Sequence, residues 1–260
     1  MLLAAIDGVG GYEGGEVAAK IAHDTIIEYL SQTVHGERPQ LLREAIAEAN
    51  NRIWQQSQTN LQLSQMSCVM TVAIADALKQ VVCFGHVGDT RLCSFHNGIL
   101  KKLTSDHSLV GYREEKGELS ETEAMNHPRR NEISRLLGSQ AHGPNDENFI
   151  DAGTGAFLPN DLLLLCSDGL TDMISSQQIV TILAQLDDLP TKTQALIAAA
   201  NAAGGRDNIT VVLATYEERE TEGRKTEDNN TEEGGGRKEN ENTTTDKPTP
   251  PSRQPTAHRR

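Results

Sequence analysis

Residues 68–103 read CVMTVAIADALKQVVCFGHVGDTRLCSFHNGILKKL, and this stretch decides the fold class. Near its end, Asn97-Gly98 is a strong signal for a tight hairpin turn. Three apolar or alternating runs precede the turn and one follows it, at 68–75, 80–86, 91–95 and 99–103. Runs of this length and pattern predict strands, so the middle of the chain is expected to be rich in sheet.

Helices are predicted on both sides of this strand-rich block. Apolar residues recur at helical spacing over 16–32, in a second helix that begins near Pro39, and over 179–186 and 193–203. Further strands are predicted at 1–6, 149–157, 162–166 and 209–216. Between them, the polar stretch 105–143 holds one short helical segment near 120–125. This order does not alternate as βαβ units do, so the predicted fold is α+β, a β-sandwich of two antiparallel sheets flanked by helices.

The chain divides into a foldable part and a tail. Its 260 residues suit one domain that is large enough to bury a core. Residues 217–260 contain no Val, Ile, Leu, Met, Phe, Trp or Tyr, so burial of apolar surface cannot offset the entropy of ordering them. We therefore predict a folded domain over 1–216 and a disordered polar tail over 217–260.

Composition restricts the partners and the compartment. The formal net charge is −13, and an acidic surface repels phosphate backbones, so nucleic acid is not expected as a partner. No stretch is long and apolar enough to span a membrane, and the apolar start at 1–6 is too short for a signal peptide. The cysteines lie in apolar runs without a C-x-x-C pair, which is typical of buried thiols in a reducing compartment; they are Cys68, Cys83, Cys93 and Cys166. A cytoplasmic monomer is expected.

Three short elements place a carboxylate at the end of an apolar run. Asp7-Gly8 and Asp168-Gly169 each follow such a run, and Asp207-Asn208 precedes one. Carboxylates are costly to bury unless they are paired or bind metal, and glycine lets the backbone approach a ligand closely. Converging carboxylates would suit hard cations such as Mg²⁺ or Mn²⁺. For each element by itself, an ordinary turn is the competing interpretation.

Five stretches, in order, are similar to motifs of the metal-dependent protein phosphatases, the type 2C serine/threonine phosphatases, in their bacterial form. They are 7–11 with 14–16, 85–91, 103–108, 163–172 and 205–210. A weaker match covers 127–131 and 135–138. Together the stretches extend over 1 to about 216, which is the whole foldable part. The resemblance implies a sandwich of two antiparallel sheets flanked by helix pairs, with metals in a cleft at one end.

The resemblance also implies a set of metal ligands. By it, Asp7 bridges two metal ions and the carbonyl of Gly8 binds one of them, while Asp168 and Asp207 complete the other. Asp106 matches a carboxylate that can hold a third ion together with Asp168. The implied cofactor is Mg²⁺ or Mn²⁺, as two ions or three.

The implied reaction is hydrolysis of phosphoserine and phosphothreonine in phosphorylated proteins, the products of serine/threonine kinases. A metal-activated water attacks phosphorus, and Asp7, Asp168 and Asp207 act through that water. No phosphoenzyme is needed, so no cysteine or serine nucleophile is expected. Residues from about 107 to 138 resemble the family's flap, which affects substrate choice. Some members carry a His after the Asp-Gly pair, where this chain has Val9.

The match departs from the family at the start of the chain. The family has an earlier strand with an Arg that grips the substrate phosphate, and an acidic residue near the second metal; neither precedes Asp7 here. A bidentate clamp of this kind contributes on the order of 2–4 kcal/mol of positioning energy. Two accounts stay open: the start lies upstream of Met1, or the protein is a pseudophosphatase that binds a partner with its activity weakened or lost. A hydrolase of small phosphoesters is a third alternative.

The remaining motif residues are interpreted as scaffold. Asp89 and Arg91 are predicted to fix a turn between two strands. His86, at the end of an apolar run, is predicted to be a hydrogen-bonded core histidine. His107 could reach the cleft, although its neighbour Asp106 has the stronger claim to a role there.

Overall fold

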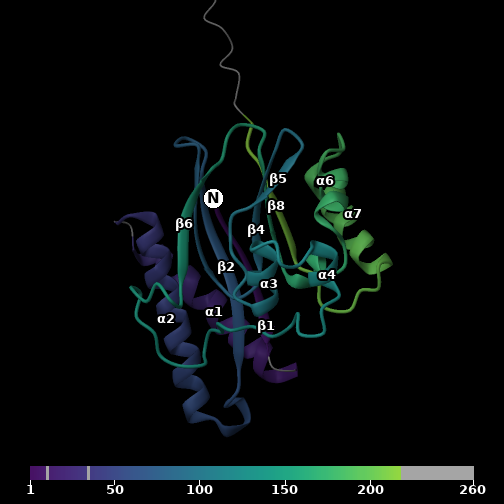
Figure 1. Ribbon diagram of the computed structural model, residues 1–260. Helices are drawn as coiled ribbons and strands as arrows, with labels where there is room; N and C mark the ends of the chain where they lie inside the picture. The colour runs from purple at the N-terminus through teal and green to yellow at the C-terminus, as the bar shows by residue number, and fades with distance from the viewer. Residues whose placement is uncertain (10–11, 34–35, 218–260) are drawn as a thin grey trace, which may run out of the picture. The chain divides into compact units, whose positions relative to one another are not determined.

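Figure 1 shows two sheets with helices on their outer faces. This computed structural model describes residues 1–9, 12–33 and 36–217, and these belong to one compact unit. The predicted polar tail, apart from its first residue, lies outside the described residues.

Both sheets are four-stranded and antiparallel, with strand orders β1-β2-β3-β6 and β5-β4-β7-β8. The first contains β1 (Leu2–Val9), β2 (Ser67–Asp76), β3 (Val81–Val87) and β6 (Asp151–Ala156). The second contains β4 (Arg91–His96), β5 (Ile99–Lys102), β7 (Leu162–Cys166) and β8 (Val211–Ala214). Asn97 and Gly98 connect β4 to β5 with φ of +49° and +80°, as the predicted hairpin turn requires. The predicted sandwich of antiparallel sheets is confirmed.

Helix pairs cover the outer face of each sheet (Figure 1). α1 (Tyr12–Gln32) and α2 (Arg38–Thr59) pack on the first sheet, and α6 (Ser176–Leu183) and α7 (Leu189–Ala202) pack on the second. A 3-10 turn (Leu61–Leu63) follows α2, and the single-turn helix α5 (Asp168–Thr171) follows β7. Pro39 lies in the first turn of α2, where its missing N–H leaves no hydrogen bond unmade. None of the helices in the described part of the chain is both long and apolar enough to cross a bilayer.

Three apolar layers explain the strand patterns. One layer lies between the two sheets, and one lies between each sheet and its helices. β7 contributes to two of them, because Leu163 and Leu165 belong to the layer between the sheets while Leu162 and Leu164 pack with α6 and α7. Successive side chains of a strand point to opposite faces, so a strand that is covered on both faces is apolar throughout.

The polar stretch between β5 and β6 holds two short helices, where the sequence predicts one. The predicted helix is α4 (Glu121–Met125), and the unpredicted one is α3 (Leu109–Glu115). Ser108 caps α3 by accepting a hydrogen bond from the backbone N–H of Gly111 at 2.9 Å. α3 buries only Val110 and Gly111, so it lacks the apolar stripe from which a helix is recognised in a sequence.

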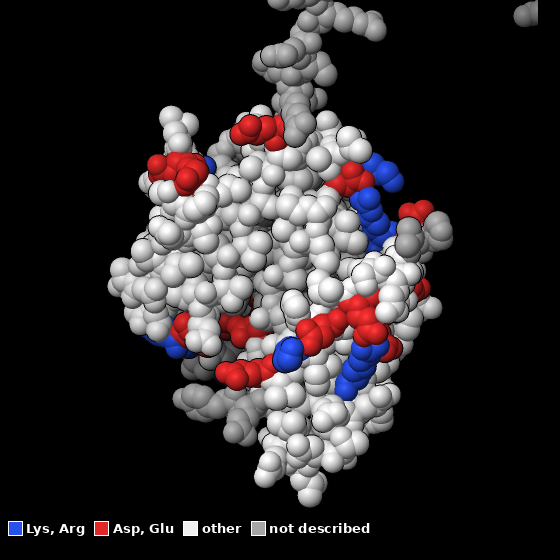
Figure 2. Space-filling view, turned by 180° about the vertical axis from the view of Figure 1, so that it is seen from behind, with Lys and Arg blue, Asp and Glu red and all other residues white. Residues whose placement is uncertain are grey.

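Exposed ion pairs lie on the outer faces of α1 and α2, and one of them, Arg52–Glu28, joins the two helices. Arg52 binds Glu28 at 2.6 Å and Glu48 at 2.8 Å, and Lys20 binds Asp24 at 2.9 Å. Figure 2 shows acidic side chains as a band across the lower half of the face seen from behind, with few basic ones among them. Each exposed pair contributes at most about 1 kcal/mol, so burial of the inner helix faces holds these helices in place.

Leu163→Ala is expected to lower the free energy of unfolding by about 2–5 kcal/mol. Leu163 is fully buried between the sheets, so its truncation leaves a cavity. Leu186→Ala is the matched control, since Leu186 is fully exposed and its truncation should change the free energy by less than about 0.5 kcal/mol. Equilibrium unfolding in urea measures both values, and equal losses would contradict the description of this layer.

Candidate active site

Three strand ends meet at one end of the sandwich. Asp7 lies near the end of β1, Asp168 follows β7, and Asp207 precedes β8. β7 pairs with β8, and β1 packs against both of them across the sandwich. The three aspartates and Gly8 therefore line one open space of about 750 Å³, which we call the cleft.

Ser167 fastens two of these strand ends to each other. Its Oγ donates a hydrogen bond to the carbonyl of Asn208 at 3.1 Å and accepts one from the backbone N–H of Thr210 at 3.0 Å. A Cβ at Gly169 would lie 2.1 Å from the Asn208 carbonyl oxygen, so only glycine permits this approach. We call this set of contacts the Ser167 clasp. It holds Asp168 and the segment that carries Asp207 against one another.

Gly8 makes a second close backbone approach. An added Cβ there would lie 2.5 Å from the carbonyl carbon of Gly15 in α1. The first strand and the first helix can therefore meet at the cleft only because position 8 carries no side chain. The predicted ligand position Gly8 thus lies in the same cleft as the predicted ligands Asp7, Asp168 and Asp207.

Negative charge is concentrated in the cleft. Burial raises the pKa of Asp168 to about 7, and repulsion by Asp172, Asp7 and Asp207 adds to this shift. Burial, followed by the charge of Asp207, also raises the pKa of Asp7. Shifts in this direction show that the protein itself supplies too little positive charge to balance the ionised carboxylates.

Asp89 lies beside the acidic residues of the cleft, whereas the sequence predicts that it fixes a turn. It lines the cleft with Asp168 and is only 9% exposed. Burial raises the pKa of Asp89 well above its usual range, and repulsion by Asp168, Asp106 and Asp7 adds to the effect. No hydrogen bond to its carboxylate occurs within the described ranges, so it does not fix the turn. Its position just after the buried strand β3 is the signal that it shares with Asp168, which comes just after β7.

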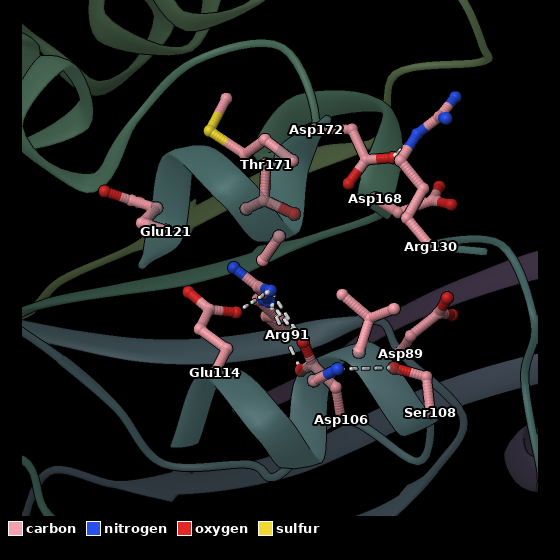
Figure 3. Close-up of a pocket in the computed structure, with 14 residues that line it drawn as sticks. Asp89, Arg91, Asp106, Ser108, Glu114, Glu121, Arg130, Asp168, Thr171 and Asp172 are labelled. Atoms are coloured by element: carbon pink, nitrogen blue, oxygen red, sulfur yellow. Dashed lines mark hydrogen bonds and ion pairs between the residues drawn. The ribbon is translucent and has the colours of Figure 1, made fainter. Parts of the chain in front are cut away.

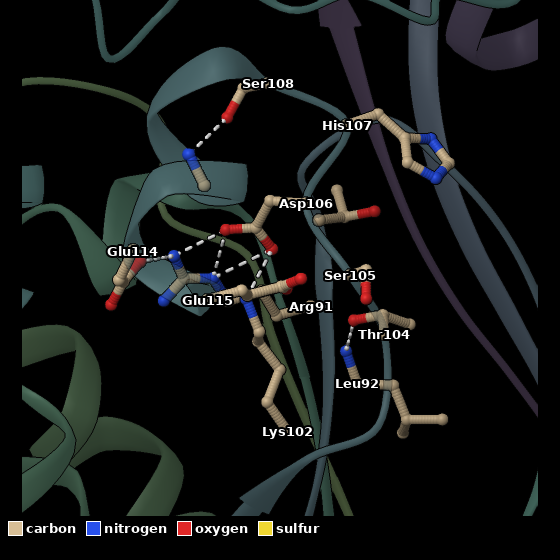
Figure 4. A network of polar contacts seen from close by, with 12 residues as sticks. Arg91, Leu92, Lys102, Thr104, Ser105, Asp106, His107, Ser108, Glu114 and Glu115 are labelled. Atoms are coloured by element: carbon tan, nitrogen blue, oxygen red, sulfur yellow. Dashed lines mark hydrogen bonds and ion pairs between the residues drawn. The ribbon is translucent and has the colours of Figure 1, made fainter. Parts of the chain in front are cut away.

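Asp106 is bound by two cations (Figure 4). Arg91 donates to Oδ2 from Nη2 at 2.6 Å and from Nε at 3.0 Å, and the Lys102 Nζ lies 3.3 Å from Oδ1. Burial acts to raise the pKa of Asp106, but Arg91 and Lys102 outweigh it and hold the pKa below its usual value. To bind a metal ion, the Asp106 carboxylate would therefore have to bind the ion and Arg91 at the same time.

His107 anchors the flap to the strands and does not line the cleft. Its backbone N–H donates to the Gly88 carbonyl at 2.7 Å, and its Nδ1 accepts from the Gly88 N–H at 3.0 Å. Its Nε2 lies 3.1 Å from Asp151, and its carbonyl accepts from the backbone N–H of Ser134 at 2.8 Å. His86 is fully buried, and its ring nitrogens lie 2.8 Å from the Thr71 Oγ1 and 3.0 Å from the Ser105 carbonyl, which confirms it as a hydrogen-bonded core histidine.

A smaller pocket lies beside α3 and α4 (Figure 3). Asp89 and Asp168 line both this pocket and the cleft. Arg130, which follows α4, donates from Nε to Asp172 at 2.8 Å. Burial keeps the pKa of Asp172 raised despite this partner. This ion pair connects residues 107–138 to the carboxylates around Asp168, which we call the acidic centre.

The donor set fits hard divalent cations. No three His, Cys, Asp or Glu side chains in the described part of the chain are close enough to enclose an ion by themselves. Mg²⁺ usually keeps several waters and is held by only one or two carboxylates, so it does not need such a cage. The carboxylates of Asp7, Asp168 and Asp207, spread along one open cleft, meet this requirement.

The sequence is similar to those of known phosphatases. The sequence profile of the family described as protein phosphatase 2C matches residues 1–202. The serine/threonine phosphatase stp of Listeria monocytogenes is 37% identical over 211 residues, which cover 80% of this chain and 81% of that protein. The protein phosphatase PhpP of Streptococcus pneumoniae is 34% identical over 220 residues, which cover 83% of this chain and 86% of that protein.

Solved structures share the fold. The serine/threonine phosphatase of S. agalactiae superposes with a TM-score of 0.73 at 32% identity, covering 83% of this chain and 87% of that one. The catalytic domain of PstP in complex with two manganese ions superposes with a TM-score of 0.72 at 27% identity, covering 84% of this chain and 88% of that one.

In metal-free protein, Asp168→Asn is expected to raise the free energy of unfolding at pH 8 by about 1–3 kcal/mol. The folded pKa of Asp168, about 7, lies above its ordinary value of 3.8, so the stability associated with its proton is lost as the pH rises through 7. Asn carries no charge at any pH. Below about pH 4, where the carboxyl is protonated in both states, the two proteins should be equally stable.

Urea unfolding in EDTA at both pH values measures this difference. Carboxylates whose pKa is lowered in the folded protein make it more stable as the pH rises, which is opposite to the effect of Asp168. The variant is therefore compared with the parent at each pH. Asp187→Asn is the control, because Asp187 is exposed and outside the cleft. A stabilisation by Asp168→Asn that does not depend on pH would contradict the electrostatic explanation.

Asp106→Ala is expected to lower the free energy of unfolding by about 3–5 kcal/mol, because Arg91 would keep a buried charge without its main partner. The side chains of Arg91 and Asp106 are only 17% and 4% exposed. Glu48→Ala is the matched control, since it breaks an exposed pair with Arg52 and should cost less than about 1 kcal/mol. Chemical denaturation measures the free energy of unfolding of both variants. Similar losses in the two would contradict the expectation that the buried Asp106–Arg91 pair matters more for stability than the exposed one.

Proposed function

The chain belongs to the protein phosphatase 2C family of metal-dependent serine/threonine protein phosphatases, and we propose that Asp7, Asp168 and Asp207 hold its metal ions in the cleft. The observation that carries this proposal is that three carboxylates from distant strand ends line one open space together with Gly8. The Gly8 carbonyl would complete the donor set. The ions would be Mg²⁺ or Mn²⁺, and two of them match the two manganese ions of the PstP structure.

The chain's own contribution is the placement of its charges. When bound, the ions supply an acidified water and neutralise charge on the phosphoryl oxygens. Asp7 lies in β1 and Asp168 comes just after β7, and packed strands hold side chains more accurately than mobile loops would. The Ser167 clasp keeps Asp168 near the segment that carries Asp207. A third ion at Asp106 would require Arg91 to release part of its hold.

Thiol chemistry does not compete with this proposal. All four cysteines are buried and none is in a disulfide. Burial raises the pKa of Cys68 to about 12 and that of Cys93 to about 11. A thiol with such a pKa is scarcely ionised at neutral pH, so it is a poor nucleophile.

Phosphorylated proteins are the substrates that this site supports best. The cleft is open enough to admit a phosphorylated side chain that is still attached to a polypeptide. We propose phosphoserine and phosphothreonine, placed there by a serine/threonine kinase, as the groups that are hydrolysed. The placement of Asp7, Asp168 and Asp207 around one cleft argues against a partner-binding module without activity.

Phosphate release from a phosphothreonine peptide tests the proposal. We expect turnover that depends on Mn²⁺ and stops in EDTA, and a fall in kcat of at least about 100-fold for Asp168→Ala. Calorimetric titration with Mn²⁺ gives a readout that does not depend on turnover, and Asp168→Ala should weaken binding by at least about 10-fold.

Asp187→Ala is the matched control, because this aspartate is exposed and lies outside the cleft. Its kcat and Mn²⁺ affinity should equal those of the parent. Turnover that persists in EDTA, or that survives Asp168→Ala unchanged, would overturn the assignment of the metal ligands.

A further inference from the structure

Arg206 is the one basic residue among the described residues that line the cleft. Every other charged residue there is acidic; these are Asp7, Glu16, Asp89, Asp168 and Asp207. A phosphate monoester brings up to two further negative charges into this space. It therefore needs hydrogen-bond donors in addition to cations that neutralise the carboxylates.

The other arginines around the acidic centre are already engaged. Each forms an ion pair with a carboxylate: Arg91 with Asp106 at 2.6 Å, Arg130 with Asp172 at 2.8 Å, and Arg135 with Asp151 at 2.8 Å. Figure 3 shows the first two of these arginines among the residues that line the smaller pocket. Within the described ranges, no ion pair or hydrogen bond involves the side chain of Arg206, which is exposed. Its N–H donors are available to a ligand.

The backbone on both sides of Arg206 is held in place. Before it, Gly204 and Gly205 have φ of +132° and +50°, and their N–H groups close the last turn of α7 with hydrogen bonds of 3.1 Å each. After it, the carbonyl of Asn208 is bound by the Ser167 clasp. Arg206 is therefore presented from a defined position beside Asp207, although its side chain is free.

Arg206 also lines a small space next to the cleft. This space of about 50 Å³ is shared with Arg130, Asn131 and Gly169, and Asp168 and Asp207 border it as they border the cleft. Arg206 thus lies between the carboxylates of Asp168 and Asp207 and the guanidinium of Arg130. Arg130 is held there by Asp172, which leaves Arg206 as the arginine that can turn toward a ligand.

From this placement we propose that Arg206 binds the phosphoryl group of the substrate and sets its position in the cleft. The inference rests on the proposed function, since it assigns a substrate contact in the same site. A guanidinium donates two parallel hydrogen bonds to phosphate oxygens, which fixes orientation as well as supplying charge. Lysine supplies the charge without the planar fork, so it should replace Arg206 only in part.

Inorganic phosphate, which contains only the group in question, is the probe. Calorimetric titration of the Mn²⁺-loaded full chain with phosphate should give a Kd that is about 10–100-fold weaker for Arg206→Gln. Arg206→Lys should fall between that variant and the parent. KM should rise by a similar factor for a phosphothreonine peptide and for p-nitrophenyl phosphate, because both carry the same phosphoryl group. The Kd for Mn²⁺ should stay within about 2-fold of the parent value, since Arg206 is not a metal ligand.

Arg52→Gln is the matched control, because it removes an exposed arginine on α2 that does not line the cleft. Its Kd for phosphate and both KM values should equal those of the parent. Three results would overturn the inference. They are an unchanged Kd for phosphate in Arg206→Gln, a rise in KM for an acidic peptide without one for p-nitrophenyl phosphate, and an equal loss of Mn²⁺ affinity. Absence of Mn²⁺-dependent turnover in the parent would instead refute the proposed function, so the two failures are distinguishable.

Discussion

The contact between Ser167 and the backbone at Asn208 and Thr210 is the constraint on which the site depends. Asp168 and Asp207 are far apart in the chain; Asp168 begins α5 just after β7, and Asp207 lies in the segment before β8. Pairing of β7 with β8 brings these ends together, and the absence of a Cβ at Gly169 allows the two backbones to touch. Without this contact, the segment that carries Asp207 would be held beside Asp168 only by the pairing of β7 with β8.

The same geometry brings several carboxylates close together, and the basic residues of the chain neutralise only some of them. Cations within the chain neutralise the carboxylates at the margin of the acidic centre, as Arg91 does for Asp106 and Arg130 for Asp172. The central carboxylates have no such partners, and their raised pKa values express that deficit. The divalent cations that we propose for the cleft would supply the missing positive charge.

The flap is connected to this centre through backbone and imidazole contacts. His107 binds Gly88 at both its backbone N–H and its Nδ1, and Gly88 precedes Asp89 in the cleft. Ser134, farther along the flap, binds the carbonyl of His107. These hydrogen bonds therefore hold residues 107–138 against the loop that carries Asp89.

Much of the fold follows from local patterns in the sequence. The Asn97-Gly98 turn, the apolar run of β7 and the helical spacing in α1 and α2 identify their elements, because each depends on neighbours within a few residues. The sequence pattern does not predict α3, because this helix is short and buries only Val110 and Gly111, so the cap at Ser108 is its main signal. The strand-end aspartates were also visible, since a carboxylate beside a buried strand is conspicuous in any sequence.

Local sequence patterns do not show which charged side chains pair with one another. Nothing near Asp89 indicates that its carboxylate stays without a hydrogen bond, and nothing near Arg91 indicates that it binds Asp106 in preference to fixing its own turn. The sequence by itself determined the strands, the turns and the carboxylates at the strand ends, because periodicity and turn chemistry are local. Only the tertiary structure decided which carboxylates share a cleft, which carboxylates pair with arginine, and that Arg206 has no ion pair within the described ranges. Charge pairing depends on distances between segments that are remote in the chain.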